Sequence, residues 1–191
     1  MNLSAGSDIY ASDYWVNAAI ELKKQLDIPV AYHVYNWHHN PFNVEYPHYF
    51  PAKEEFISGA KTLRENGLFV LPYINAVSWE TCDREAGHEI NFTNSGLAAA
   101  VKDESGNVVA DPYPQTTVSG KKVLLAPVCP TCRIWSDIVE AISDEINRTL
   151  PVDGIYFDEV AARASQLCFN ENHDHPSGGG SYWVEGYRAI M

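Results

Sequence analysis

Val152-Asp153-Gly154-Ile155-Tyr156-Phe157-Asp158-Glu159-Val160 is the most informative stretch of the chain, because an apolar run ends there in two carboxylates. Its β-branched and aromatic residues follow Pro151 and predict a short buried strand. Side chains alternate along a strand, so Tyr156 and Asp158 share one face. A strand that follows a helix and ends in an acid is typical of α/β proteins, where ligands bind at that end. Capping of the next turn by Asp158 or Glu159 is the alternative interpretation.

Strands and helices alternate along the rest of the chain. Apolar residues at helical spacing predict helices at residues 13–26, 53–65 and 133–150, and a last helix that begins near Tyr182. Apolar runs predict strands at residues 30–35, 68–75, 122–128 and 152–160. Right-handed crossovers would bring the ends of all four strands to one side of a parallel sheet.

The predicted fold class is α/β, a (β/α)8 TIM-type barrel present here as a partial barrel of roughly four β/α units, since a complete barrel needs about 250 residues. We expect residues 1–191 to form a single domain, the N-terminal half of a longer barrel. Residues 81–120 are expected to be a long excursion between strands that holds a small hairpin. Closure by a homodimer partner, in place of the remaining half of the barrel, and a smaller open sheet are the alternatives.

Composition excludes several classes of partner. The 191 residues are 46% apolar and 20% charged, with 25 acidic and 13 basic residues and a net charge of −12. Phosphate backbones require a positive surface, so no nucleic acid is expected as a partner. No run approaches the roughly 20 apolar residues of a membrane span, so no membrane partner is expected. Because no signal peptide is evident at the start, the default expectation is a cytoplasmic protein with reduced thiols.

The spacing Tyr156-x-Asp158 suits the hydrolysis of a glycosidic bond. Retaining glycosidases hold one carboxylate rigidly as the nucleophile, with a second acid about 5 Å away. Asp158 is therefore the candidate nucleophile. Among the other acids near strand ends, Glu80, Asp83 and Glu159, none stands out, so the second acid is expected on a strand outside this chain.

Aromatic and polar residues gather after the predicted strands and favour a cleft that binds a carbohydrate substrate. Flat apolar rings pack on the faces of pyranose sugars, while Asn and His side chains bond to hydroxyl groups. Aromatic residues also fill the periphery of ordinary cores, which is the competing interpretation. The candidate substrate-binding residues are Trp37, His38, Asn75, Trp79, Cys129, Tyr156, His173 and His175.

Histidines raise the alternative of a metal-dependent hydrolase. His173-Asp174-His175 beside Asp158 would supply suitable ligands. However, His38 and His39 are adjacent. Barrel hydrolases of this kind instead carry a His-x-His pattern, with one residue between the two histidines, at the end of the first strand. We therefore assign no metal ligand and no cofactor from the sequence.

Cysteines offer a further alternative. Cys129-x-x-Cys132 follows a strand and opens a helix, and a helix N-terminus lowers the pKa of a thiol, which suits a thioredoxin-like redox site. A structural zinc site needs a second such pair or suitably spaced histidines, whereas Cys82 and Cys168 stand alone in the sequence. A structural or substrate-facing Cys129 is favoured over the redox site.

Two segments carry a resemblance to a known family, residues 152–158 and the motif His173-x-His175-Pro176-x-Gly178-Gly179-Gly180-x-Tyr182-Trp183-Val184-Glu185-Gly186-Tyr187-Arg188. There, and at Pro127-Val128-Cys129-Pro130, the sequence resembles a bacterial barrel family, domain of unknown function family 6259. That family is distantly similar to glycoside hydrolases of the α-galactosidase group. The resemblance is specific over about residues 120–190 and looser before them.

The resemblance implies a (β/α)8 catalytic barrel from a larger carbohydrate-active protein. Related glycosidases carry the nucleophile in a Lys-x-Asp pattern at the end of the fourth strand. Asp158 occupies the matching position, but Tyr156 replaces the lysine. The family's general acid would lie on a later strand. A carbohydrate-binding or vestigial barrel fragment without turnover is the non-enzymatic alternative.

Overall fold

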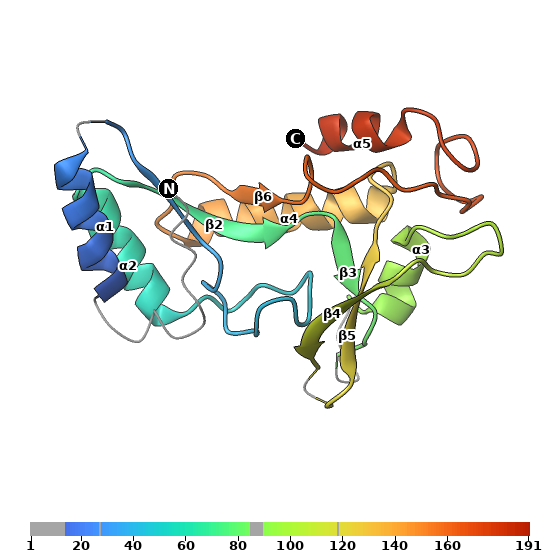
Figure 1. Ribbon diagram of the computed structural model, residues 1–191, viewed down its shortest axis with the longest axis horizontal. Helices are drawn as coiled ribbons and strands as arrows, with labels where there is room; N and C mark the ends of the chain where they lie inside the picture. The colour runs from blue at the N-terminus through green and yellow to red at the C-terminus, as the bar shows by residue number, and fades with distance from the viewer. Residues whose placement is uncertain (1–13, 27, 85–89, 118) are drawn as a thin grey trace. The chain divides into compact units, whose positions relative to one another are not determined.

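The structure is a computed structural model that describes residues 14–26, 28–84, 90–117 and 119–191. The first residue of the predicted helix 13–26 lies outside the described residues. The chain divides into two compact units. The first comprises Met1–Phe42, Tyr49–Ile74 and Ile142–Phe157, and the second comprises Asn43–His48, Asn75–Ala141 and Asp158–Met191. Figure 1 shows the elements of both units.

The first unit is built on a small sheet in the order β1-β2-β6. β1 (Ala31–Val34) runs parallel to β2 (Phe69–Asn75), with Ala31 opposite Phe69 and Val34 opposite Pro72. α2 (Glu54–Glu65) connects these two strands, which makes a βαβ unit, and β6 (Tyr156–Asp158) lies on the other side of β2. The predicted strand 152–160 is confirmed in its central part only.

Helix α1 (Tyr14–Gln25) contacts α2 through a close approach at Gly59. A Cβ atom at Gly59 would lie 2.3 Å from Cζ2 of Trp15, whose indole is buried. The helices predicted at residues 13–26, 53–65 and 133–150 are confirmed, because their apolar residues repeat at the spacing of one helix face. α2 ends as expected, with Gly67 at a φ of 77° beyond its last turn.

The second unit holds an antiparallel sheet in the order β3-β5-β4, whose strands lie together in Figure 1. β5 (Lys122–Pro127) lies between β3 (Ser78–Glu80) and β4 (Asp111–Thr116). β4 lies within residues 81–120 and forms a hairpin with β5, which follows that segment; the excursion itself stays a prediction. β4 is an edge strand, which is where a sheet tolerates the prolines that this strand carries.

This sheet corrects the prediction that the strand at residues 122–128 belongs to the same parallel sheet as the others. β5 pairs with β3 and β4, both antiparallel. The physical reason is a tight turn, in which the Gly120 N–H donates to the Thr117 carbonyl at 2.9 Å with Gly120 at a φ of 78°. The turn returns the chain directly onto β4. The fold shown is therefore mixed α/β with two small sheets.

The other elements of the second unit surround a core of its own. A π-helix (Phe92–Gly96) continues into the short α3 (Leu97–Ala99), and α4 (Arg133–Thr149) begins in this unit. α5 (Tyr182–Ile190) confirms the predicted last helix. One buried apolar cluster of this unit consists of Val77, Val101, Cys129, Cys168, Tyr182, Trp183 and Tyr187. Among the described residues, no helix has the length and apolarity that crossing a membrane requires.

Candidate functional site

Asp158, the candidate nucleophile, is the last residue of β6 and is half-buried. The sequence prediction that this carboxylate stands at the end of a strand is therefore confirmed. Tyr156 lies two positions earlier in β6, so strand alternation places both side chains on the same face of that strand. The chain then turns sharply, because Glu159 has a φ of 64°.

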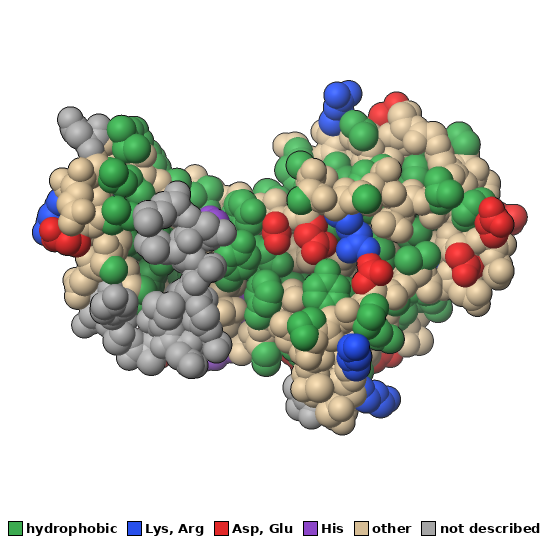
Figure 2. Space-filling view, in the orientation of Figure 1, with side chains coloured by type: hydrophobic (Ala, Val, Ile, Leu, Met, Phe, Trp, Pro, Cys, Tyr) green, Lys and Arg blue, Asp and Glu red, His purple; other side chains and the backbone are tan. Residues whose placement is uncertain are grey.

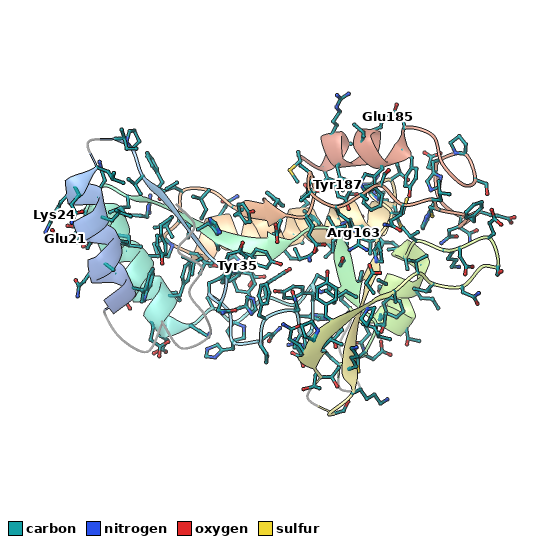
Figure 3. The ribbon with its side chains drawn as sticks, in the orientation of Figure 1. Glu21, Lys24, Tyr35, Arg163, Glu185 and Tyr187 are labelled. Atoms are coloured by element: carbon teal, nitrogen blue, oxygen red, sulfur yellow. The ribbon has the colours of Figure 1, made fainter. Side chains whose placement is uncertain are left out.

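Tyr156 belongs to a group of aromatic rings in the first unit, which we call the aromatic patch: His33, Tyr35, Phe42, Tyr73 and Tyr156. Tyr156 stacks on His33, with ring centroids 4.4 Å apart and planes 11° from parallel. Tyr35, labelled in Figure 3, lies 4.7 Å from Tyr73 and 5.7 Å from Phe42 by ring centroids. All members except the buried Tyr73 are half-buried.

The sequence prediction missed four members of the aromatic patch: His33, Tyr35, Phe42 and Tyr73. Alternation along β1 was the available signal, since His33 and Tyr35 are two residues apart and must share one face. Rings that share a half-exposed face can pack on the apolar face of a sugar.

Glu159, the residue after Asp158, takes part in a network of polar side chains in the second unit. The Tyr113 hydroxyl donates to Glu159 Oε1 at 3.1 Å, and Arg163 Nη1 lies 3.6 Å from Glu159 Oε2. Arg163 also pairs with Asp111. Figure 3 labels Arg163, and on the face seen in Figure 2 a basic side chain lies among acidic ones.

Burial and the neighbouring carboxylates set the charges of this network. Burial raises the pKa of Tyr113 to about 12, and the charge of Glu159 raises it as well. Burial disfavours the charged form of Arg163, but hydrogen bonding to Asp111 leaves the pKa of Arg163 above the usual value. Tyr113 is therefore a hydrogen-bond donor and Arg163 a cation at neutral pH, and both hold the Glu159 side chain.

Glu80, at the end of β3, is a buried acid in the same unit. One oxygen of its carboxyl accepts the Glu45 N–H, and Glu45 pairs with Arg84. Burial raises the pKa of Glu80 above its ordinary value. Such a shift is needed in a general acid, but a buried acid enclosed by backbone is also a common structural feature.

Four of the predicted substrate-binding residues are buried within their own units. Trp37 donates its indole N–H to the Tyr73 carbonyl at 2.7 Å, and the neighbouring His38 is fully buried. Asn75 Oδ1 accepts the N–H groups of Val77 at 2.9 Å and Ser78 at 3.0 Å, which shapes the turn into β3. Trp79 is 1% exposed. Contact of these four residues with a glycan stays a prediction.

The remaining predicted residues are Cys129, His173 and His175, which the structure brings together with Cys168. One possible ligand atom from each of these four residues lies within 4.8 Å of all the others, and we call them the Cys/His cluster. The expectation that Cys168 stands apart is wrong, because the loop after β6 returns to the end of β5. The signal in the sequence was a second motif, Cys168-x4-His173-x-His175.

Two alternatives raised from the sequence, a metal-dependent hydrolase and a thioredoxin-like redox site, are not favoured by the arrangement of these residues. The histidines His173 and His175 lie with two cysteines, and Asp158 is not part of the Cys/His cluster. Cys129 is 0% exposed, and a hydrogen bond with Cys168 raises the pKa of Cys129 while lowering that of Cys168. A fully buried thiol is inaccessible to a substrate disulfide, so the geometry does not favour a thioredoxin-like role for Cys129.

Two solved glycosidase structures show the same fold at low sequence identity. An α-N-acetylgalactosaminidase from Bifidobacterium bifidum in complex with GalNAc superposes with a TM-score of 0.66 at 14% identity, covering 95% of this chain and 27% of that one. An α-galactosidase from Thermus thermophilus superposes with a TM-score of 0.57 at 12% identity, covering 98% of this chain and 34% of that one. The chain therefore shares the fold of part of these glycosidase structures.

The chain belongs to the family described as Domain of unknown function (DUF6259), which matches residues 7–191. A putative glycoside hydrolase from Bacteroides thetaiotaomicron is 32% identical over 162 residues, which are 85% of this chain and 22% of that protein. Another from Monosiga brevicollis is 26% identical over 193 residues, covering 92% of this chain and 15% of that protein. The resemblance seen in the sequence is confirmed, and the chain spans about a fifth of these relatives.

Proposed function

We propose that the chain is part of a glycoside hydrolase that cleaves α-linked galactose or N-acetylgalactosamine from a glycan, with Asp158 as the nucleophile. The observation that carries the proposal is the position of Asp158 at the end of β6, followed by a turn that Tyr113 and Arg163 hold through Glu159. A nucleophilic carboxylate must be held rigidly, and a strand end gives that rigidity. The names of the solved relatives with this fold suggest the two sugars.

A (β/α)8 barrel is the architecture that we propose for the complete domain. β1, α2 and β2 form a βαβ unit with parallel strands, which is the repeating element of such barrels. β6 is at the edge of its sheet, and Tyr156 and Phe157 are half-buried. A further strand beside β6 would cover them, and we place the general acid on a strand of that further part.

The test is the Asp158→Asn variant of the full-length protein, assayed with p-nitrophenyl α-galactoside and p-nitrophenyl α-N-acetylgalactosaminide. We expect a loss of kcat on the order of 10³-fold or more with an unchanged melting temperature, because the amide cannot attack the anomeric carbon. Asp144→Asn, an exposed acid on α4, is the matched control and should keep full activity. An Asp158→Asn variant with unimpaired turnover would refute the assignment.

A second function, binding of a glycan without turnover, is favoured by one observation. Tyr156 stands where related glycosidases carry a lysine, and its ring stacks on His33. Thermal melts against a panel of monosaccharides and oligosaccharides test binding directly, since a ligand of the folded state raises its apparent stability. A rise in melting temperature without product formation by the full-length protein would select this function over hydrolysis.

A further inference from the structure

We propose that Cys129, Cys168, His173 and His175 bind one zinc ion as a closed structural site. Their ligand atoms already lie within 4.8 Å of one another. In tetrahedral sites with Zn–S bonds of about 2.3 Å and Zn–N bonds of about 2.0 Å, ligand atoms are about 3.3–3.8 Å apart. A contraction of about 1.5 Å at most, within reach of side-chain rotation, completes the tetrahedron.

The outer hydrogen bonds of both histidines match those of metal ligands. His173 Nε2 lies 2.8 Å from the Ala98 carbonyl, and its Nδ1 lies 3.3 Å from Cys168 Sγ. His175 Nδ1 lies 2.8 Å from the Pro176 carbonyl. A ring nitrogen that donates to a carbonyl leaves the other nitrogen with a lone pair, which is how ligating histidines are usually oriented. We therefore assign His173 Nδ1 and His175 Nε2 as the ligands.

His175 Nε2 is the atom that most needs a partner. It is buried and has no hydrogen-bond partner, although its ring is fixed by stacking on Tyr182 at a centroid distance of 4.0 Å. A buried polar atom without a partner is unfavourable unless something unseen satisfies it. A metal ion bound by the other three residues would do so.

The surroundings favour a structural ion. Cys129 and Cys168 are fully buried in the apolar core beside Tyr182 and Trp183, and His173 is 8% exposed. Two thiolates balance the charge of one divalent cation, so the complete site adds no net charge to this core. Four protein ligands leave no position for water or substrate, which distinguishes a structural site from a catalytic one.

The ligand set selects zinc among common metals. Two thiolates and two imidazoles in a tetrahedron are typical of zinc, whereas magnesium and calcium require oxygen ligands. Cys132 contacts His173 but lies outside the Cys/His cluster. We therefore expect it not to be a ligand.

The ion would join two segments that are far apart in the sequence. Cys129 follows β5 and precedes α4, whereas the other three ligands lie in the loop between β6 and α5. Among the described residues, backbone bonds inside this loop are local, such as Gly178 N–H to the Cys168 carbonyl at 2.7 Å, whereas the Phe169 N–H donates to the distant Lys102 carbonyl at 2.9 Å. Zinc would therefore fix the loop that follows Asp158, independently of what the protein hydrolyses or binds.

The experiment measures metal in the purified protein, prepared without a polyhistidine tag under reducing conditions. Elemental analysis should find one zinc per chain, and replacement by Co²⁺ should give a thiolate-to-cobalt charge-transfer band with the visible bands of tetrahedral cobalt. Cys168→Ser and His175→Ala should each bind Co²⁺ at least tenfold more weakly. The matched controls Cys82→Ser and Cys132→Ser should retain one zinc.

Binding of Co²⁺ by the unmutated protein keeps the proposal testable if a variant fails to fold. A wild-type protein that stays folded, takes up neither zinc nor Co²⁺ and shows the same melting temperature with and without a chelator would overturn the proposal. So would a disulfide between Cys129 and Cys168 under reducing conditions, or cobalt spectra without a thiolate band. Loss of zinc binding by Cys132→Ser would likewise contradict the assigned ligand set.

Discussion

Replacing Gly186 by alanine should destabilise the second unit, because α5 touches the turn after β5 at this glycine. A Cβ atom at position 186 would lie 2.7 Å from the carbonyl carbon of Pro130 and 2.8 Å from its Cβ. Carbon atoms in contact are about 3.5–4.0 Å apart. The helix would therefore have to move by about 1 Å, and a backbone atom cannot rotate aside as a side chain does.

The magnitude follows from two opposed effects. Overpacking of a core costs about 1–3 kcal/mol, and the backbone contact places Gly186→Ala near the upper end. Alanine in a helix interior is favoured over glycine by about 1 kcal/mol. The net loss in the free energy of unfolding is about 2 kcal/mol, or a fall in melting temperature of about 4–8 °C for a chain of this length.

Urea denaturation followed by circular dichroism measures this loss. The matched control is Val184→Ala on the same helix, where the side chain is 53% exposed, and its unfolding free energy should change by less than about 0.5 kcal/mol. A Gly186→Ala protein as stable as the unmutated one, or more stable, would show that α5 does not need the close approach.

Two further predictions concern the first unit. Asp153 accepts hydrogen bonds from the Val70 N–H and the Arg64 Nε–H, each at 2.9 Å. Asp153→Ala should therefore lower the free energy of unfolding by about 1–3 kcal/mol. Arg64→Ala, at the exposed end of the pair, should lower it by less than about 1 kcal/mol. Equal losses in urea denaturation would contradict the larger contribution assigned to the bond from the Val70 N–H. Burial, and then the charge of Lys53, lower the pKa of His38 to about 3, so the unfolded chain binds a proton first as the pH falls. The contribution of neutral His38 to the free energy of unfolding is fully present above about pH 6.5 and is lost as the pH falls toward 3. His38→Gln should therefore flatten the plot of unfolding free energy against pH in this range. An unaltered slope would refute the lowered pKa of His38.

The elements of the fold were predictable wherever one face of a segment is apolar. The periodicity of residues 53–65 predicts α2, and Asn66-Gly67 predicts its end, because these signals are local. The strand at residues 122–128 was predicted as a strand but assigned the wrong partners. An apolar run specifies that a segment is buried and extended, while its partner depends on the turn that precedes it, here at Gly120.

The candidate site was predictable in part for a similar reason. Asp158 was identified because a strand and its terminal acid are adjacent in the sequence. The Cys/His cluster was not, since Cys129 and Cys168 come together only through the return of a long loop. Trp37 and Trp79 illustrate a different limit, because an aromatic ring after a strand suits a core and a cleft equally well, and here both indoles are buried.

Glu159 adopts a backbone conformation that has a consequence for the chemistry beside it. A φ of 64° is disfavoured for a residue with a side chain by about 1 kcal/mol, a penalty that glycine would avoid. The chain nevertheless has a glutamate here, and its carboxylate is held by a phenol and a guanidinium. The left-handed turn and these anchors together leave the peptide after Asp158 little freedom to swing, so a ligand that meets the carboxylate meets it already oriented.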